Sequence, residues 1–562
     1  MQCNVAGRHD WSSVLLVLAA HASVGIAAST STPRPSVQQI EAIYADAVDD
    51  AGVITTIDSG LFDTYRGRDL DWWKQRYSRQ RRELAEHAAR ISTRRLSPDD
   101  ARALRIMRGS LASTLPENPL FAASTLPAPT GHCGETSRTD IGAAALRDDM
   151  YACFDSLGNH LLFEGKVVSR DSAITLLGQI EEPARRKALF LAFAPLWEAV
   201  NGKDEPGSPY RRMIRTAAAD AAAHGSGIEA AGRDLGLMPA QIEEWLTRIL
   251  ETWREVTPDS PVEPWDYRYV AGEGDRELTA AISAASLLPV TKRYFHDLGA
   301  DLDGLGIIYD LESRAGKAPV TYANYVTMGR VVNGHWRPTL ARVSASYSDS
   351  GLYVLNMLTH ESGHTVHYAA IRNRPAFMDI GDDLFCESFA DVTSWNVYDP
   401  AWQQKYLGHS VTERGGLRSQ YTMVTLEVAW SLFELRMLHN PDADPNLVWT
   451  EITSRYFHVV PHPEYSWWVQ RGQLVTTPGF MANYGLGAVV TADIRQRIRS
   501  SIGPFNTGND RWYPWVSRNL LRSGLQFDTS VILRKFLGRP VSLEPLLTDI
   551  RRIPATAPIS PR

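Results

Sequence analysis

The chain is 562 residues long, beyond the size at which a single compact core stops growing. Its composition, with 44% hydrophobic and 22% charged residues, is that of an ordinary globular protein. A formal charge of -6 with both signs interspersed gives no electrostatic footprint for nucleic acid or for an anionic membrane, so neither is an expected partner.

The first 28 residues are typical of a secretory signal peptide. Arg8 precedes a short apolar run from Val14 to Ala20, and small residues follow through Ala28. A basic start, a short apolar region and a small-residue exit are the parts of such a signal. The run is too short for a comfortable membrane span, so we expect a periplasmic or secreted protein without stable membrane insertion. An uncleaved anchor is the alternative.

Cys133 and Cys153 are predicted to form a disulfide bond. Cys133 lies in a loop rich in Gly, Pro, Ser and Thr, and Cys153 lies on the helical segment that follows. In an oxidising compartment these two are the natural pair. The pair and the export signal therefore indicate the same compartment.

Residues 29–270 are predicted to form an N-terminal helical part. Segments of helical period follow one another there, with Pro, Gly and Asp clusters between them. The clearest segments cover residues 35–50, 70–91, 97–111, 172–199 and 238–254. Residues 271–562 continue the same unit and carry the residues whose chemistry is recognisable, so we expect them to be the catalytic part.

A small antiparallel sheet is expected within this second part. Three short runs, at 305–310, 320–325 and 341–347, alternate or are rich in β-branched and aromatic residues, and turn residues bound them. The helical pattern resumes at residue 349 and continues almost to the end. The fold class is therefore mainly α, with one small sheet immediately before the most informative helix.

That helix contains a His-Glu-x-x-His motif. His360 and His364 lie one turn apart on the same face, so both imidazoles can reach one ion. Glu361 is rotated by about 100° from His360, close enough to hold a water without ligating the metal. Two neutral nitrogen ligands and an adjacent base are parts of a zinc hydrolase site. A solvated helix face is the alternative, but the apolar run at 352–358 indicates burial.

The next helical segment, residues 382–399, offers the third ligand that catalytic zinc takes. Glu387 and Asp391 lie on one face of it, four residues apart, among apolar neighbours. We expect one Zn²⁺ per chain, bound by His360, His364 and Glu387. Asp391 is expected to accept a hydrogen bond from a ligand histidine, which would fix the tautomer of that histidine.

These residues resemble the thimet oligopeptidase and oligoendopeptidase family of zinc peptidases. The resemblance is carried by His360-Glu361-x-Gly363-His364-x-x-His367 with Glu387 23 residues later, by residues 309–317, and by Asn483-Tyr484-Gly485-Leu486. The Glu387-x-x-x-Asp391 spacing is also similar to that of angiotensin-converting enzyme. The likeness covers about residues 305–400 and 465–495. Ser362 departs from it, since the family usually has an aromatic residue there.

The resemblance implies a large two-lobed helical peptidase, a monomer, whose deep cleft restricts substrates to short, unstructured peptides. Glu361 would be the general base, and Tyr484 would donate to the scissile carbonyl oxygen in the transition state. His458, His462 and Tyr465 are candidates for further substrate or transition-state contacts. The strand at 341–347 is expected to pair with an extended peptide by strand addition.

Three other functions stay open at this point. One is a dipeptidyl carboxypeptidase of the angiotensin-converting-enzyme type, which a basic pocket residue gripping a substrate carboxylate would mark. Arg471 and Lys317 are the candidates for that residue. The second is a zinc hydrolase that acts on a non-peptide amide. The third is a catalytically inactive peptide-binding relative, against which the intact metal motif counts.

Overall fold

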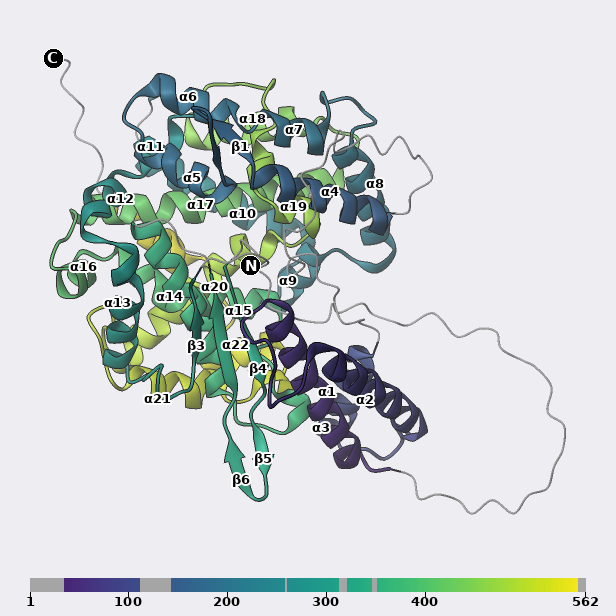
Figure 1. Cartoon of the computed structure of the whole chain (residues 1–562). Coiled ribbons are helices and arrows are strands. Elements are labelled where there is room, and N and C mark those ends of the chain that lie inside the picture. The colour runs from purple at the N-terminus through teal and green to yellow at the C-terminus, as the bar shows by residue number, and fades with distance from the viewer. Residues whose placement is uncertain (1–34, 112–142, 258–259, 313–320, 346–350, 554–562) are drawn as a thin grey trace, which may run out of the picture.

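The computed structural model describes residues 35–111, 143–257, 260–312, 321–345 and 351–553. The chain is mainly helical, which confirms the predicted fold class (Figure 1). Residues 1–28, Cys133 and Lys317 lie outside the described residues, so the signal peptide and the disulfide stay predictions. Within the described ranges, no helix has the length and apolar character needed to cross a bilayer.

The first three helices form a small bundle at one side of the molecule (Figure 1). They are α1 (Val37–Asp58), α2 (Leu70–Arg90) and α3 (Pro98–Ser110). Each begins at a Ser or Asp side chain that accepts a hydrogen bond from the first turn. The bundle has small apolar cores of its own, one of which includes Val326 of the neighbouring sheet. The N-terminal bundle is thereby attached beside the strands.

Helices α4 to α13 follow, with the hairpin β1 (Leu161–Phe163) and β2 (Lys166–Val168) after the first of them. Their bounds are α4 (Ala143–Gly158), α5 (Arg170–Gln179), α6 (Pro183–Leu191), α7 (Ala194–Asn201), α8 (Pro209–His224), α9 (Gly227–Leu235), α10 (Pro239–Val256), α11 (Tyr267–Ala271), α12 (Glu273–Leu278) and α13 (Ala284–Asp297). The stretch at 172–199 is divided among α5, α6 and α7. Pro183 and Pro195 stand at the starts of α6 and α7, where a missing N–H costs nothing.

The sheet has three strands in the order β3-β7-β4. They are β3 (Ile308–Asp310), β4 (Tyr322–Thr327) and β7 (Leu340–Ser344). β4 runs antiparallel to β7 as expected, but β3 runs parallel to it, so the sheet is mixed. A separate hairpin of β5 (Arg330–Val332) and β6 (His335–Arg337) projects from the sheet at the bottom of Figure 1.

Helix α14 (Leu352–Ala370) follows the sheet, and α15 (Asp383–Ser394) packs against it. The remaining helices are α16 (Pro400–Leu407), α17 (Glu413–His439), α18 (Pro445–Phe457), α19 (Gln473–Thr476), α20 (Ala482–Ile502), α21 (Trp512–Val516), α22 (Thr529–Leu537) and α23 (Glu544–Arg551). Short 3-10 turns are η1 (Thr279–Ala281), η2 (Pro375–Phe377), η3 (Trp395–Tyr398), η4 (Trp467–Gln470) and η6 (Gly524–Gln526), and η5 (Ser517–Leu521) is a π-helix.

The helices gather into two layers that share one core. Figure 1 shows α4 to α8, α17 and α18 in one layer, and α13 to α15 with the sheet in the other. The largest apolar core runs from Leu146 to Ile553 and takes side chains from both layers. α15 packs on α20, and α20 packs on α17, so the two metal-motif helices are held at the centre of the molecule.

Candidate metal centre

Helices α14 and α15 carry the proposed ligands, and both are buried along most of their length. The N-terminus of α14 is capped from a distance, because Asp275 of α12 accepts hydrogen bonds from the backbone N–H groups of Leu352 and Tyr353. Asp382 caps α15 by accepting from Phe385 N–H at 3.0 Å. The N-terminus of each helix is therefore capped upstream of the proposed ligands.

Gly363 lets the two helices approach each other closely. A Cβ placed on Gly363 would lie 2.9 Å from both the Cα and the carbonyl oxygen of Ala390 on α15. A side chain there would push the helices apart. The neighbouring Ser362 pairs with the Tyr309 hydroxyl of β3 at 2.8 Å. The serine that departs from the family pattern thus ties the helix to the sheet.

His360, His364 and Glu387 converge as predicted. Their ligand atoms all lie within 4.8 Å of one another, and all three side chains are buried. His360 Nε2 is 3.1 Å from His364 Nε2 and 3.2 Å from Glu387 Oε2, and His364 Nε2 is 3.9 Å from Glu387 Oε2. Ligands about 2.1 Å from a tetrahedral zinc ion stand about 3.4 Å apart. The three donors therefore fit one zinc ion.

The charge states of His364 and Glu387 suit a cation. Burial, together with the charge of His360, lowers the pKa of His364 to about 3, so its imidazole stays neutral and keeps its lone pair. Burial alone would raise the pKa of Glu387, but the hydrogen bond and charge of the histidines outweigh it and lower the pKa. Glu387 is consequently an anionic ligand. A carboxylate with two imidazoles is a donor set that zinc takes.

Asp391 lies one helical turn beyond Glu387 and orients His360. Its Oδ1 accepts a hydrogen bond from His360 Nδ1 at 2.7 Å and another from Ser394 Oγ at 2.9 Å. Despite the burial of His360, the carboxylate of Asp391 raises its pKa and holds a proton on Nδ1, so that Nε2 would be the atom that ligates a metal ion. The structure thus brings Asp391 to the predicted position.

Glu361 is 1% exposed and lies beside the ligands without joining them. Its carboxylate accepts a hydrogen bond from the backbone of Ala323 on β4, whereas its Oε1 atom has no partner within the described residues. Burial raises the pKa of Glu361 to about 7. A carboxylate with a free oxygen and a pKa near neutrality can accept and return a proton.

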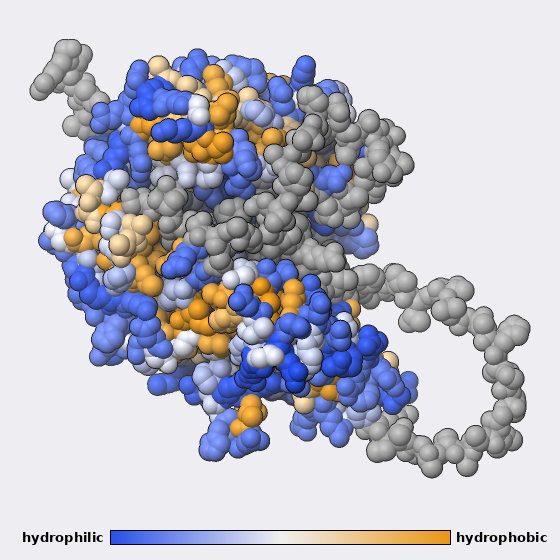
Figure 2. Space-filling view, viewed as in Figure 1, coloured by the Kyte–Doolittle hydropathy of each residue, from blue (hydrophilic) through white to orange (hydrophobic). Residues whose placement is uncertain are grey.

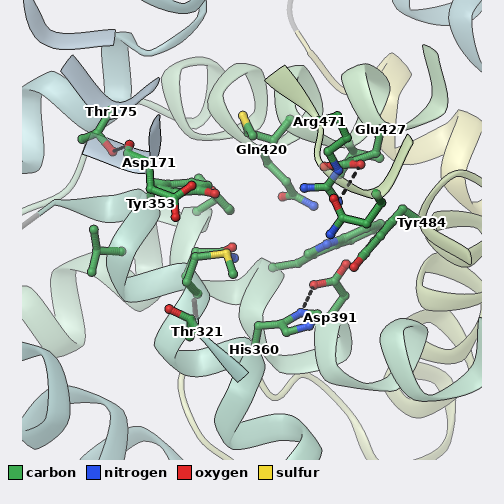
Figure 3. A pocket seen from close by; sticks show the side chains of 18 of the residues that line it. Asp171, Thr175, Thr321, Tyr353, His360, Asp391, Gln420, Glu427, Arg471 and Tyr484 are labelled. Atoms are coloured by element: carbon green, nitrogen blue, oxygen red, sulfur yellow. Dashed lines mark hydrogen bonds and ion pairs between the residues drawn. The ribbon is translucent and has the colours of Figure 1, made fainter. Parts of the chain in front are cut away.

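A pocket opens directly beside this centre, and Tyr484 lies in its wall together with His360 and Asp391 (Figure 3). Tyr484 is in the first turn of α20, and burial raises the pKa of its hydroxyl well above the ordinary value. The phenol therefore keeps its proton and can donate a hydrogen bond. Tyr484 lines the same pocket as His360, and its role as a donor stays a prediction.

The same pocket contains Arg471, which the sequence offered as a candidate pocket cation, and the charged residues Glu427, Arg170 and Asp171, which it did not. Arg471 pairs with Glu427 of α17 at 3.1 Å, and its guanidinium lies 4.6 Å from the ring centre of Tyr484. Arg170 and Asp171, at the start of α5, line the far side, and Figure 3 shows Asp171 across from Tyr484. Glu427 could have been found from the sequence, since an acidic residue within an apolar helical run indicates a buried functional group. No sequence pattern pointed to Arg170 or Asp171.

His458, His462 and Tyr465 are not brought to the centre. None of them lines the pocket beside the metal ligands. His462 bonds to Glu263 at 2.9 Å and to Glu464 at 2.7 Å, and Tyr465 packs on Phe190 and Trp197. His458 ends α18 in a left-handed conformation. The pocket therefore gives no support to their proposed role as substrate contacts, and His462 and Tyr465 contact other residues of the chain.

The strand that was expected to bind a peptide, β7, has no free edge. β7 is the central strand of its sheet and is paired on both edges, by β3 and by β4. Its backbone groups are therefore engaged, and strand addition to it is excluded. β4 is an edge strand, and its Ala323 reaches Glu361.

Comparisons with known proteins give likenesses among solved structures and no family. No protein-family model matches the chain, and no curated protein matches it. Among solved structures, the chain is similar to an M32 carboxypeptidase from Deinococcus radiodurans R1, with 14% identity and a TM-score of 0.47. The match covers 92% of this chain and 98% of that one. At this level the likeness assigns neither a family nor an activity.

Proposed function

We propose that the protein is a zinc-dependent metallopeptidase that hydrolyses peptide bonds in short, unstructured peptides. The observation that carries the proposal is the convergence of His360, His364 and Glu387 within 4.8 Å, with Glu361 beside them. Zinc, when bound, supplies Lewis acidity that polarises a carbonyl and lowers the pKa of water. The remaining chemistry belongs to side chains of this chain.

Glu361 takes the proton of the attacking water and passes it to the departing amine. Its buried carboxylate and its raised pKa suit both transfers. Tyr484, protonated and in the same pocket, donates to the carbonyl oxygen as negative charge develops on it. Asp391 holds His360 in one tautomer throughout. The shared pocket wall of His360, Asp391 and Tyr484 supports this assignment of roles.

The burial of the centre supports an extended peptide as the substrate. The three ligands and Glu361 are at most 4% exposed, and the pocket beside them lies between the helical layers. A folded protein surface does not reach such a centre, whereas a single extended chain does. An endopeptidase acting on short peptides is therefore our first choice.

The test is to map cleavage products of a mixture of short peptides by mass spectrometry, before and after chelation and after zinc is restored. We expect cleavage that stops on chelation and returns with zinc, at one bound zinc per chain. Stoichiometric zinc without cleavage of any peptide would favour the inactive binding role. Cleavage of small amides but not of peptides would favour the non-peptide hydrolase.

Glu361→Gln is the variant that separates catalysis from metal binding. It should lower kcat about a thousandfold, because the general base is lost, while the bound zinc remains at one per chain. Glu277→Gln, an exposed residue outside the pocket, is the matched control and should keep full activity. Full activity in Glu361→Gln would contradict the proposed mechanism.

A carboxypeptidase is the second candidate, and the position of Arg471 favours it. Arg471 is a largely buried guanidinium in the wall that Tyr484 and His360 share, where it could bind a substrate carboxylate. Replacing it alone would leave Glu427 without its partner, so Arg471→Gln is made together with Glu427→Gln. For a carboxypeptidase, the double variant should raise KM about tenfold for peptides with a free C-terminus. For an endopeptidase, free and amidated peptides should be affected equally.

A further inference from the structure

A second pocket, remote from the metal centre, is surrounded by positive charge. It lies where the segment after α14 meets η5 and α22, and its charged lining consists of four cations. These are Arg372, Arg518, Arg522 and Lys535. No aspartate or glutamate lines it. This basic pocket is separate from the pocket that contains His360 and Tyr484.

The four cations have no acidic partners. All four are exposed, and within the described part of the chain none forms an ion pair with a carboxylate. The acids of the adjoining surface are already engaged, Glu41 with Arg374 and Asp46 with Arg330. Clustered like charges repel one another. A bound anion would remove that repulsion.

The backbone holds this cluster in place. Arg372 N–H donates to Arg522 O at 3.2 Å, and Asn373 Nδ2 donates to Ser523 O at 2.8 Å. These two bonds join segments that are 150 residues apart in the chain. Arg518 projects from η5, a π-helix, which is a rare conformation found frequently at functional sites. The chain segments that carry Arg372 and Arg522 are consequently held next to each other.

Exposed apolar side chains border the same cations. Phe527 and Val531 line the basic pocket and are 38% and 47% exposed. Arg372 and Arg522 also line a neighbouring groove that includes Val331 and Val332 of the β5–β6 hairpin, which are 64% and 41% exposed. Figure 2 shows this hairpin as an apolar spot on a hydrophilic surface at the bottom of the view. Cations beside exposed apolar groups match a phospholipid surface.

We propose that this face docks the protein onto an anionic membrane. The basic pocket binds the phosphate of a lipid headgroup, while Phe527, Val531 and the hairpin valines enter the interfacial region. The attachment is peripheral, and it is independent of the proposed peptidase activity. The whole-chain charge of -6 does not exclude this attachment, because it averages the charge of this face with that of the rest of the chain.

The experiment is co-sedimentation of the full chain with vesicles of phosphatidylcholine, with and without about 30% phosphatidylglycerol. We expect binding only to the anionic vesicles, and a loss of most of it between about 0.1 M and 0.5 M salt. Arg372→Gln, Arg518→Gln, Arg522→Gln and Lys535→Gln combined should weaken binding about tenfold or more. Val331→Ser with Val332→Ser should weaken it without changing the salt dependence.

A control with the same charge change tests whether the location matters. Lys74→Gln, Arg79→Gln, Arg82→Gln and Arg105→Gln remove four exposed cations from α2 and α3. An equal loss of binding in this control would overturn the proposal. So would a rise in Tm of the wild type with inorganic phosphate alone and no vesicle binding, since the pocket would then serve a soluble anion. Unchanged Tm values of both variants in the absence of vesicles would confirm that they fold.

Discussion

At the scale of single residues, the centre depends on a carboxylate that does not touch the metal. Asp391 holds His360 at 2.7 Å and is itself held by Ser394 at 2.9 Å. Without that acceptor, His360 can rotate or place its proton on Nε2, the atom that must ligate. Part of the free energy of zinc binding would then be used to bring His360 back into the ligating orientation.

We therefore expect Asp391→Asn to lower zinc affinity about 10-fold to 100-fold, since an amide can present a donor to Nδ1 and accepts more weakly. Competition with a chromophoric chelator measures this directly. Ser394→Ala removes only the bond that steadies Asp391, so its effect should be several times smaller. If Asp391→Asn bound zinc as tightly as the wild type, the orienting role would be wrong.

The ligands could be predicted from the sequence because helical period is local information. His360, His364 and Glu361 are placed by their spacing, and Glu387 and Asp391 by an amphipathic face one helix later. Asp275 could not be found in this way, because it caps α14 from another helix 77 residues earlier. The sequence placed His458 and His462 near the site by their chemistry alone. Tertiary packing decides which pocket a side chain lines, and they do not line this one.

At the scale of elements, the critical contact is the crossing of α14 and α15. Gly363 faces the backbone of Ala390, and a methyl group there would overlap the Cα and the carbonyl oxygen at 2.9 Å. We expect Gly363→Ala to destabilise the protein by about 2 kcal/mol and to weaken zinc binding, because the helices must separate. Thermal unfolding with and without zinc measures both effects.

Gly109→Ala is the matched control, since Gly109 is also helical and a Cβ there meets nothing within 4 Å. Alanine at that position should be neutral or stabilise by up to about 1 kcal/mol. Equal Tm values for Gly363→Ala and the wild type would show that the helix crossing tolerates a side chain.

Sequence patterns located most helices but missed two hairpins, β1–β2 and β5–β6, and joined three helices. Residues 70–91 and 97–111 closely match α2 and α3. The β5–β6 hairpin turns at Asn333 and Gly334, which both have positive φ, and Asn-Gly between β-rich runs is a strong hairpin signal that was available. The parallel pairing of β3 with β7 could not be predicted from the sequence, because the tertiary fold and not the local sequence decides which strands pair in parallel.

At the scale of the whole molecule, the two helical layers are joined by buried polar contacts as well as by the apolar core. Glu434 of α17 accepts a hydrogen bond from Met481 N–H at 2.9 Å, at the start of α20, the helix that carries Tyr484. Burial raises the pKa of Glu434 to about 8. Near neutral pH this carboxyl is therefore mostly protonated in the folded protein and ionised in the unfolded chain.

The sign of the pH dependence follows from that difference. Between about pH 4.5 and pH 8 the folded state binds more protons at Glu434, so this contribution to stability is complete below pH 4.5 and is lost as the pH rises to 8. Glu434→Gln mimics the protonated form and does not titrate. The stability of the variant relative to the wild type should rise by up to about 4 kcal/mol from pH 5 to pH 8.

Thermal unfolding of both proteins across this range tests the expectation, because taking their difference removes the titration of every other group. The variant should unfold at a similar temperature to the wild type at pH 5 and at a higher temperature at pH 8. A constant difference would mean that Glu434 is ionised when folded. The junction of α17 with α20 would then require a cation that pairs with Glu434, and none does so within the described residues.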